Sequence, residues 1–233
     1  MIFNYGASDR RTRLVHNWAQ FLLRTLSILL GNAFFALGIA SFLHADLGMN
    51  TWAVLDVGIV EHTCLTLGQS TQLTGLAALL LGWGLGFPPG FATVISVYSM
   101  GWFVDAVLIL GLVPQSADIA VRCALLMAGI ALFGAGTYFY VNPRMGAGPR
   151  DSLMMGLIRR LGRPVSHVRT GLELSVLAVG YLLGGPVGVG TVVSAMLVGY
   201  AVDLAFRLGK YDRDAEHLDL HSILLYLRGR KTM

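Results

Sequence analysis

The fold of this chain is decided by one polar stretch, Asn142-Pro143-Arg144-Met145-Gly146-Ala147-Gly148-Pro149-Arg150-Asp151, which separates two long apolar runs. A related stretch, His44-Ala45-Asp46-Leu47-Gly48-Met49-Asn50-Thr51-Trp52-Ala53, lies 98 residues earlier in a similar setting. Glycine permits positive φ or a close approach of two backbones, and proline suits the first position of a helix. We therefore expect residues 44–50 and 142–150 to break the chain and each to start a shorter helix.

The composition indicates a membrane protein. The chain is 55% hydrophobic and only 13% charged, with a mean hydropathy of +0.66, whereas a soluble domain carries about twice that charged fraction. Apolar runs of about 20 residues recur, each long enough to cross a hydrocarbon core of about 30 Å. The sequence lacks the short alternating segments of a membrane β-barrel. It therefore predicts an all-α, polytopic membrane helix bundle.

Six of the apolar runs are long enough to span a membrane, and two are not. A helix of a dozen residues reaches only about 18 Å, so the short apolar segments that follow the breaks are predicted to be half-helices, either re-entrant or interfacial. These short segments are residues 51–62 and 151–158. The six predicted spans are residues 21–43, 70–86, 91–113, 121–141, 168–184 and 187–207.

The two halves of the chain resemble each other. Residues 24–111 align with residues 122–209 without a gap, and 23 of the 88 aligned positions are identical, more than shared apolarity explains. Three crossings in each half make the two copies inverted relative to each other. The predicted units are a basic N-terminal lead, a first membrane repeat, a linker, a second membrane repeat and a C-terminal tail, at residues 1–20, 21–113, 114–120, 121–209 and 210–233.

The basic residues orient this bundle. In the inverted topology all of the 17 Lys and Arg residues except Arg122 lie on the side of the two termini. The positive-inside rule then places both termini in the cytoplasm. If the short segments also crossed, the halves would be parallel and the basic residues would discriminate poorly between the two orientations. Nucleic-acid binding is not expected, because the basic clusters flank spans and no binding motif accompanies them.

The sequence shows no arrangement of Cys, His, Ser or acidic residues that is typical of a catalytic site. Cys64 and Cys123 lack the spacing of a redox or metal pair and are predicted to be packing residues. The sequence shows no Ser-His-Asp, Cys-His or paired-carboxylate arrangement in a convincing context. We therefore predict no catalytic residue, no metal ion and no cofactor, and we do not expect an enzyme.

The breaks also carry a family resemblance. The chain resembles the bacterial YczE/YyaS/YitT-type integral membrane proteins in Ala45-Asp46-Leu47-Gly48 with Trp52, and in Met145-Gly146-Ala147-Gly148-Pro149-Arg150-Asp151. It also resembles them in Val168-Arg169-Thr170 with Glu173, and in Leu183-Gly184-Gly185-Pro186-Val187-Gly188-Val189-Gly190-Thr191. The resemblance extends from about Leu26 to Phe206 and implies a multi-pass protein of the bacterial inner membrane. In the first copy, Thr51 and Ala53 stand where Pro and Asp are expected.

The breaks supply the predicted substrate-binding residues. Inverted repeats with broken helices are typical of secondary transporters, whose half-helix ends point at a substrate near the midplane. Arg150 beside a helix N-terminus favours an anionic solute. The alternative is a helix lying flat in the interface, with its arginines on lipid phosphates. The predicted residues are Gly48, Asn50, Trp52, Gly146, Gly148, Pro149, Arg150 and Asp151.

Charged residues within the spans are the second group of candidates. Arg169 and Glu173 are four residues apart and are expected to pair on one helix face. Asp105 and Asp203 are equivalent positions of the two halves. Intramembrane carboxylates are costly and often serve coupling or substrate contact, but each Asp has a structural alternative, a bond to a neighbouring helix or, for Asp203, solvation at the inner end. Asp56 is expected to be solvated at the outer interface.

Together these features predict a secondary transporter for a small solute, with proton coupling as an option. The solute, the coupling ion and the direction are left open. A homodimer through the Gly-rich faces is also expected, because small residues permit close helix packing in lipid. The alternative is a non-transporting accessory or regulatory protein of the membrane that acts through a partner.

Overall fold

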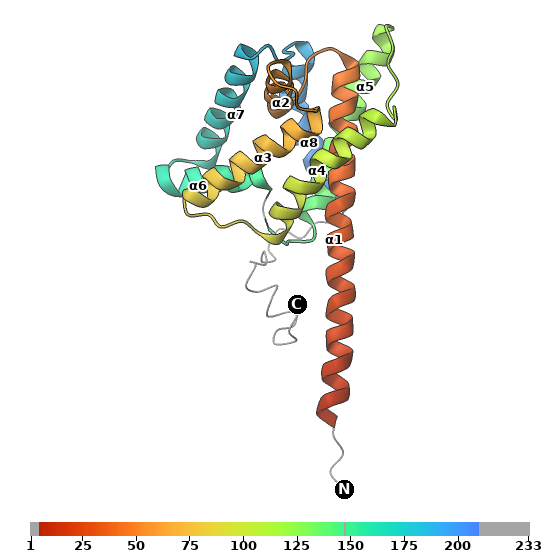
Figure 1. Cartoon of the computed structure of the whole chain (residues 1–233), viewed down its shortest axis with the longest axis vertical. Helices are drawn as coiled ribbons and strands as arrows, with labels where there is room; N and C mark the ends of the chain where they lie inside the picture. Colours follow the sequence, from red (N-terminus) through yellow and green to blue (C-terminus); the bar gives the residue numbers. More distant parts are fainter. Residues whose placement is uncertain (1–4, 147, 210–233) are drawn as a thin grey trace.

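The computed structural model describes residues 5–146 and 148–209, and these residues form eight helices and no strand (Figure 1). The predicted all-α class is therefore confirmed. The predicted tail, residues 210–233, lies outside the described residues. The helices are α1 (Tyr5–Ala45), α2 (Thr51–Glu61), α3 (Leu67–Gly84), α4 (Phe91–Ile109), α5 (Ile119–Val141), α6 (Pro149–Leu161), α7 (Val165–Leu182) and α8 (Val189–Leu208).

Both predicted breaks are present, and each starts a short helix. Gly48 and Gly146 have φ values of 103° and 131°, which side chains other than glycine rarely tolerate. The Asn50 side chain caps α2 by accepting a hydrogen bond from the amide of Ala53. Pro149 is the first residue of α6, where its missing N–H leaves no bond unmade.

Four helical segments are long and apolar enough to cross a membrane: Trp18–Ala45 within α1, and all of α4, α5 and α8. The chain is thus an integral membrane protein. The predicted second and fifth spans form α3 and α7, which do not reach this level of hydropathy. Their first halves are polar: α3 begins with a run of Gln, Ser and Thr, and α7 carries His167, Arg169 and Glu173.

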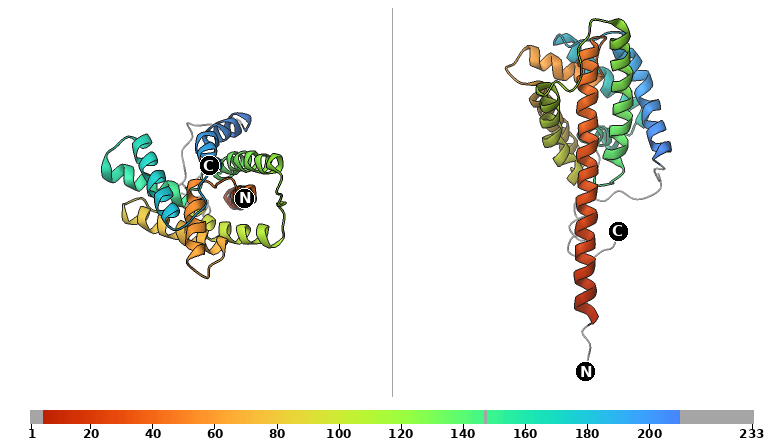
Figure 2. Two further views of the ribbon diagram at one scale, coloured as in Figure 1. Left: turned by 90° about the horizontal axis from the view of Figure 1, so that it is seen from above. Right: turned by 90° about the vertical axis from the view of Figure 1, so that its right-hand side faces the viewer.

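Helices α1 and α5 pack along each other and run antiparallel (Figure 2). At one end the Ser27 hydroxyl donates to the carbonyl of Phe139 at 2.7 Å, and at the other Arg122 Nε donates to the carbonyl of Ala45 at 2.7 Å. Between them a Cβ on Gly31 would lie only 2.8 Å from the Gly136 carbonyl oxygen. The glycines thus let the two helices touch through their backbones.

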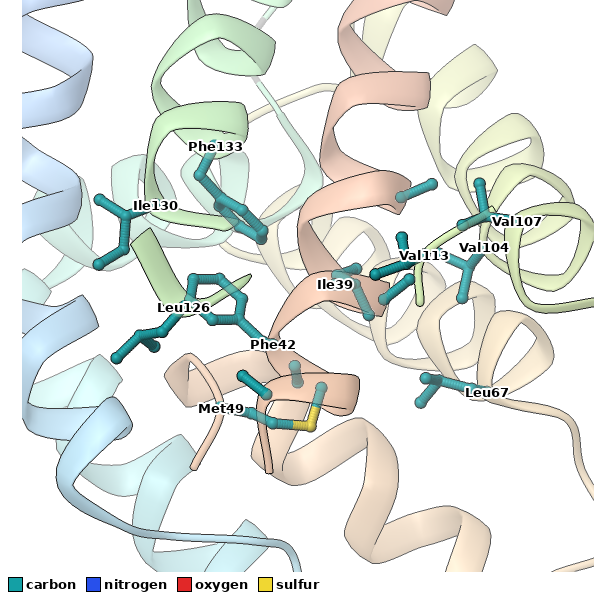
Figure 3. Close-up of a cluster of buried hydrophobic side chains, with 14 of the residues drawn as sticks. Ile39, Phe42, Met49, Leu67, Val104, Val107, Val113, Leu126, Ile130 and Phe133 are labelled. Atoms are coloured by element: carbon teal, nitrogen blue, oxygen red, sulfur yellow. The ribbon is translucent and has the colours of Figure 1, made fainter. Parts of the chain in front are cut away.

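An apolar cluster packs around the C-terminal part of α1 and the neighbouring part of α5 (Figure 3). Phe42 of α1 is fully buried and packs its ring against Phe133 of α5, with ring centroids 5.5 Å apart. Met49, from the first break, lies in the same cluster. Gly48 and Met49 of the first break are therefore buried in the core, while Asp46 of the same break is exposed.

Each break packs against the other half of the chain. The Met49 amide donates to the Pro186 carbonyl at 3.2 Å, just before α8 begins, and the Ala92 amide donates to the Met145 carbonyl at 3.0 Å, where α4 begins. The short helices also pack against the other half of the chain: α2 packs on α7, and α6 packs on α3. Both short helices therefore lie between the halves.

Candidate functional site

A buried carboxylate is the centre of the site. Asp56 on α2 is 0% exposed, and it accepts hydrogen bonds from the hydroxyls of Thr74 at 2.6 Å and Thr71 at 3.0 Å. The Ser70 hydroxyl donates to the backbone carbonyl of Asp56 at 2.7 Å. The expectation that Asp56 is solvated at an interface is wrong, because the polar first half of α3 covers α2 and supplies these hydroxyls.

Arg150 of α6 faces Asp56 from the other half of the chain. Its Nη2 lies 3.5 Å from Asp56 Oδ2, and its side chain is 24% exposed. Its guanidinium carbon also lies 4.7 Å from the ring centroid of Trp52, a geometry in which the ring face attracts a cation. The second residue of α2 thus touches the second residue of α6.

Glu173 of α7 completes this row of contacts. Its Oε1 accepts a hydrogen bond from Trp52 Nε1 at 3.2 Å. The predicted ion pair between Arg169 and Glu173 is not formed: no ion pair within 4.0 Å joins these two described residues. Glu173 bonds to Trp52 instead, because packing of α7 on α2 brings the indole N–H to it.

Asp151 stands next to Arg150 in the first turn of α6 and is exposed. Its charge interacts with those of Arg150, Arg169 and Glu173. We call Asp56, Arg150, Asp151, Arg169 and Glu173 the charged cluster. It holds three carboxylates and two guanidinium groups, so it carries one negative charge in excess when all five are ionised.

The remaining break residues shape the backbone. A Cβ on Gly48 would lie 2.5 Å from the amide nitrogen of Gly188, and a Cβ on Gly146 would lie 2.8 Å from Gly90 Cα. Asn50 caps α2, while Gly148 and Pro149 start α6. Of the predicted substrate-binding residues, the structure brings Trp52, Arg150 and Asp151 together with Glu173.

Asp105 and Asp203 lie apart from the charged cluster and have different partners. Asp105 accepts hydrogen bonds from the Thr66 hydroxyl at 2.6 Å and from the Gly68 amide at 2.8 Å, so it caps the start of α3. Asp203 forms an ion pair with Arg207 at 2.7 Å on its own helix. The contacts of Asp105 match the structural alternative of a bond to a neighbouring helix, whereas the pair of Asp203 lies within α8.

Sequence reasoning missed Asp56 as a site residue, along with Thr71 and Thr74. One signal was available: Asp56 lies four residues after Trp52, and therefore on the same face of the short helix. Thr71 and Thr74 likewise share one face of α3. Among the described residues, no group of three or more His, Cys, Asp or Glu side chains is placed to hold a metal ion.

Comparison with known proteins finds relatives over most of the chain. The model of a family described as "Family of unknown function (DUF6198)" matches residues 22–207. An "Uncharacterized protein" of Haemophilus influenzae is 35% identical over 186 residues, which cover 79% of this chain and 84% of that protein. The "Uncharacterized membrane protein YczE" of Bacillus subtilis is 30% identical over 184 residues, which cover 77% and 84%. No solved structure matches the chain.

Proposed function

The chain belongs to the DUF6198 family, as its resemblance to the YczE-type membrane proteins predicted, and from this premise we propose that it is a secondary transporter for a small solute. The observation that carries the proposal is the ion pair between the buried Asp56 and the half-buried Arg150, on the two short helices. Charges inside a membrane protein are expensive and are typical of solute or ion pathways. The proposed role involves no covalent chemistry, so the protein is proposed not to be an enzyme.

We infer that the two halves form an inverted repeat, and the helix starts support this. Helices α6, α7 and α8 begin at Pro149, Val165 and Val189, each 98 residues after the starts of α2, α3 and α4 at Thr51, Leu67 and Phe91. The antiparallel α1 and α5 have the relation that an inverted repeat requires. Trp52 and Arg150, also 98 residues apart, contact each other, as expected if a pseudo-two-fold axis passes between the two short helices.

In the proposed topology α3 and α7 are the second and fifth of six crossings. The short helices α2 and α6 are re-entrant, because they are packed between the halves. Both termini face the cytoplasm of a bacterial inner membrane, because the basic residues lie on that side. Transporters with this architecture bind solute where the half-helices meet, which here is the charged cluster.

The two ends of the molecule differ in a way that fits alternating access. At the C-terminal end of α1, helices α3 and α4 pack closely against each other. Gly68 and Gly101 form this contact, and both are buried. At the opposite end, the equivalent residues of α7 and α8, Ser166 and Gly199, are exposed. We infer that the charged cluster is reached from the cytoplasmic end in this arrangement, and that an inverse arrangement opens the outer end.

Reconstitution of the purified chain tests the proposal. Vesicles are incubated with an isotopically labelled extract of small metabolites, and their contents are identified by mass spectrometry. We expect at least one solute to accumulate with the wild-type chain, and Glu173→Gln to reduce its uptake at least tenfold. Asp203→Asn is the control, because its ion pair lies on the exposed side of α8. Absence of uptake, together with a co-purifying protein partner, would favour the accessory role.

A further inference from the structure

We propose that Asp151 and Tyr140 form a binding site for a monovalent cation beside the charged cluster. The inference rests on the proposed function and names the class of solute or coupling ion. The sequence alone predicted that the positive charge of Arg150 favours an anionic solute. That charge is compensated by Asp56 at 3.5 Å and covered by the Trp52 ring at 4.7 Å, so Arg150 is not available as an anion site.

The accessible charge of the charged cluster is negative. With Arg150 and Asp56 paired, Asp151 and Glu173 remain, and Arg169 is the only guanidinium left to offset them within the cluster. Asp151 is exposed, and it forms no hydrogen bond or ion pair with the described residues. Two carboxylates near each other repel when both are ionised, and a bound cation relieves that repulsion.

A second, independent feature points to a ligand at the same place. Tyr140 on α5 is 5% exposed, and its hydroxyl lies near the Ser96 side chain but makes no well-formed hydrogen bond with the described residues. Buried polar groups are normally paired, and an unpaired one indicates a missing ligand, water or ion. The hydroxyl oxygen has lone pairs that suit a cation, as does a carboxylate.

Gly148 joins these two groups in space. A Cβ built on Gly148 would lie 3.2 Å from Asp151 Oδ2 and 3.8 Å from the Tyr140 hydroxyl, so both oxygens lie near the same side of the Gly148 backbone. The φ and ψ of Gly148 are −58° and 160°, which any residue adopts. The backbone conformation of residue 148 therefore does not require glycine. The absence of a side chain leaves room for the Asp151 carboxylate.

The chemistry of the site selects a singly charged cation. It offers one carboxylate and one neutral hydroxyl, with Glu173 as a more distant second carboxylate. No group of three or more His, Cys, Asp or Glu side chains is available for a divalent metal ion in the described part of the chain. An alkali ion and a protonated primary amine share this chemistry, and the experiment separates them.

Thermal unfolding of the purified chain in lipid nanodiscs tests the site. Sodium, potassium or ethylammonium chloride is titrated at constant ionic strength against N-methylglucamine chloride. A ligand that binds only the native state raises the melting temperature with the logarithm of its concentration. We expect this rise for at least one cation, its loss in Asp151→Asn, and an apparent affinity at least fivefold weaker in Tyr140→Phe.

Gly148→Ala supplies a test that leaves every charge in place. Its methyl group would crowd the Asp151 carboxylate, so we expect at least a fivefold loss of affinity. Gly171→Ala is the matched control, because no heavy atom lies within 4 Å of its added Cβ, and it should respond as the wild type does. The proposal is overturned if no cation stabilises the wild type, or if Asp151→Asn and Gly148→Ala respond like it.

Binding and transport fail separately in these experiments. Cation-dependent stabilisation that Asp151→Asn abolishes, without any solute flux in vesicles, keeps the cation site and removes the transporter. Solute flux that is the same in wild type and Asp151→Asn keeps the transporter and removes the cation site.

Discussion

Helices α3 and α4 pack closely, whereas the equivalent helices of the second half, α7 and α8, do not. A Cβ on Gly68 would overlap the Gly101 carbonyl oxygen, so α3 and α4 touch through their backbones. The equivalent positions, Ser166 and Gly199, are exposed, and a Cβ on Gly199 would meet no heavy atom within 4 Å. One interface is closed and its counterpart is open.

Among the described residues, helix α3 is also held by more hydrogen bonds than its counterpart α7. Helix α3 is held by Asp105 at its start and by Asp56 through two hydroxyls. Helix α7 is joined to α2 by the bond between Trp52 and Glu173. Packed interfaces tend to have two discrete arrangements and do not deform continuously. The comparison therefore suggests that the closed and open contacts can exchange between the halves.

The largest expected effect comes from removing the charge that anchors α3 to the centre. Asp56→Asn leaves the Arg150 guanidinium without its ion-pair partner, and breaking a buried pair in this way costs about 3–5 kcal/mol. Equilibrium unfolding in mixed micelles measures the loss. Arg150→Met in the Asp56→Asn background should recover part of it, and strict additivity of the two changes would show that the pair does not interact.

Glycine substitution compares the two interfaces directly. Gly101→Ala forces α3 and α4 apart and should lower the free energy of unfolding by about 1–3 kcal/mol, as overpacking does. Gly199→Ala should leave stability within about 0.5 kcal/mol of the wild type, or raise it slightly through helix propensity. An equal loss in both variants, measured by the same unfolding assay, would contradict the open state of the α7–α8 contact.

The two equivalent aspartates should also respond unequally. Asp105→Asn weakens the cap at the start of α3 and should cost about 1.5–3 kcal/mol, the range for hydrogen bonds to a charged group. Asp203→Asn breaks an exposed pair on one helix and should cost at most about 0.5 kcal/mol. Melting temperatures in detergent show which of the two variants is less stable. A larger loss of stability for Asp203→Asn than for Asp105→Asn would contradict the structural roles given to these two residues.

The parts of the fold that depend on local chemistry could be predicted from the sequence. Gly48, Gly146 and Pro149 act through backbone conformation, so the breaks and the short helices were visible before any contact was known. The burial of Asp56 could not be predicted, because it depends on α3 folding over α2. The local pairing of Arg169 with Glu173 failed for a similar reason, since the indole of Trp52 arrives from a distant segment.

The exchange of the two interfaces is tested most directly by measuring both distances in liposomes with pulsed electron paramagnetic resonance. Spin labels at the exposed residues Leu73 and Ala106 report on α3 and α4, and labels at Gly171 and Leu204 report on α7 and α8, with Cys64 and Cys123 changed to Ser. We predict two distances for each pair, with the short one dominant between α3 and α4 and the long one dominant between α7 and α8. A single distance for each pair, unchanged by every cation and solute tested, would contradict alternating access.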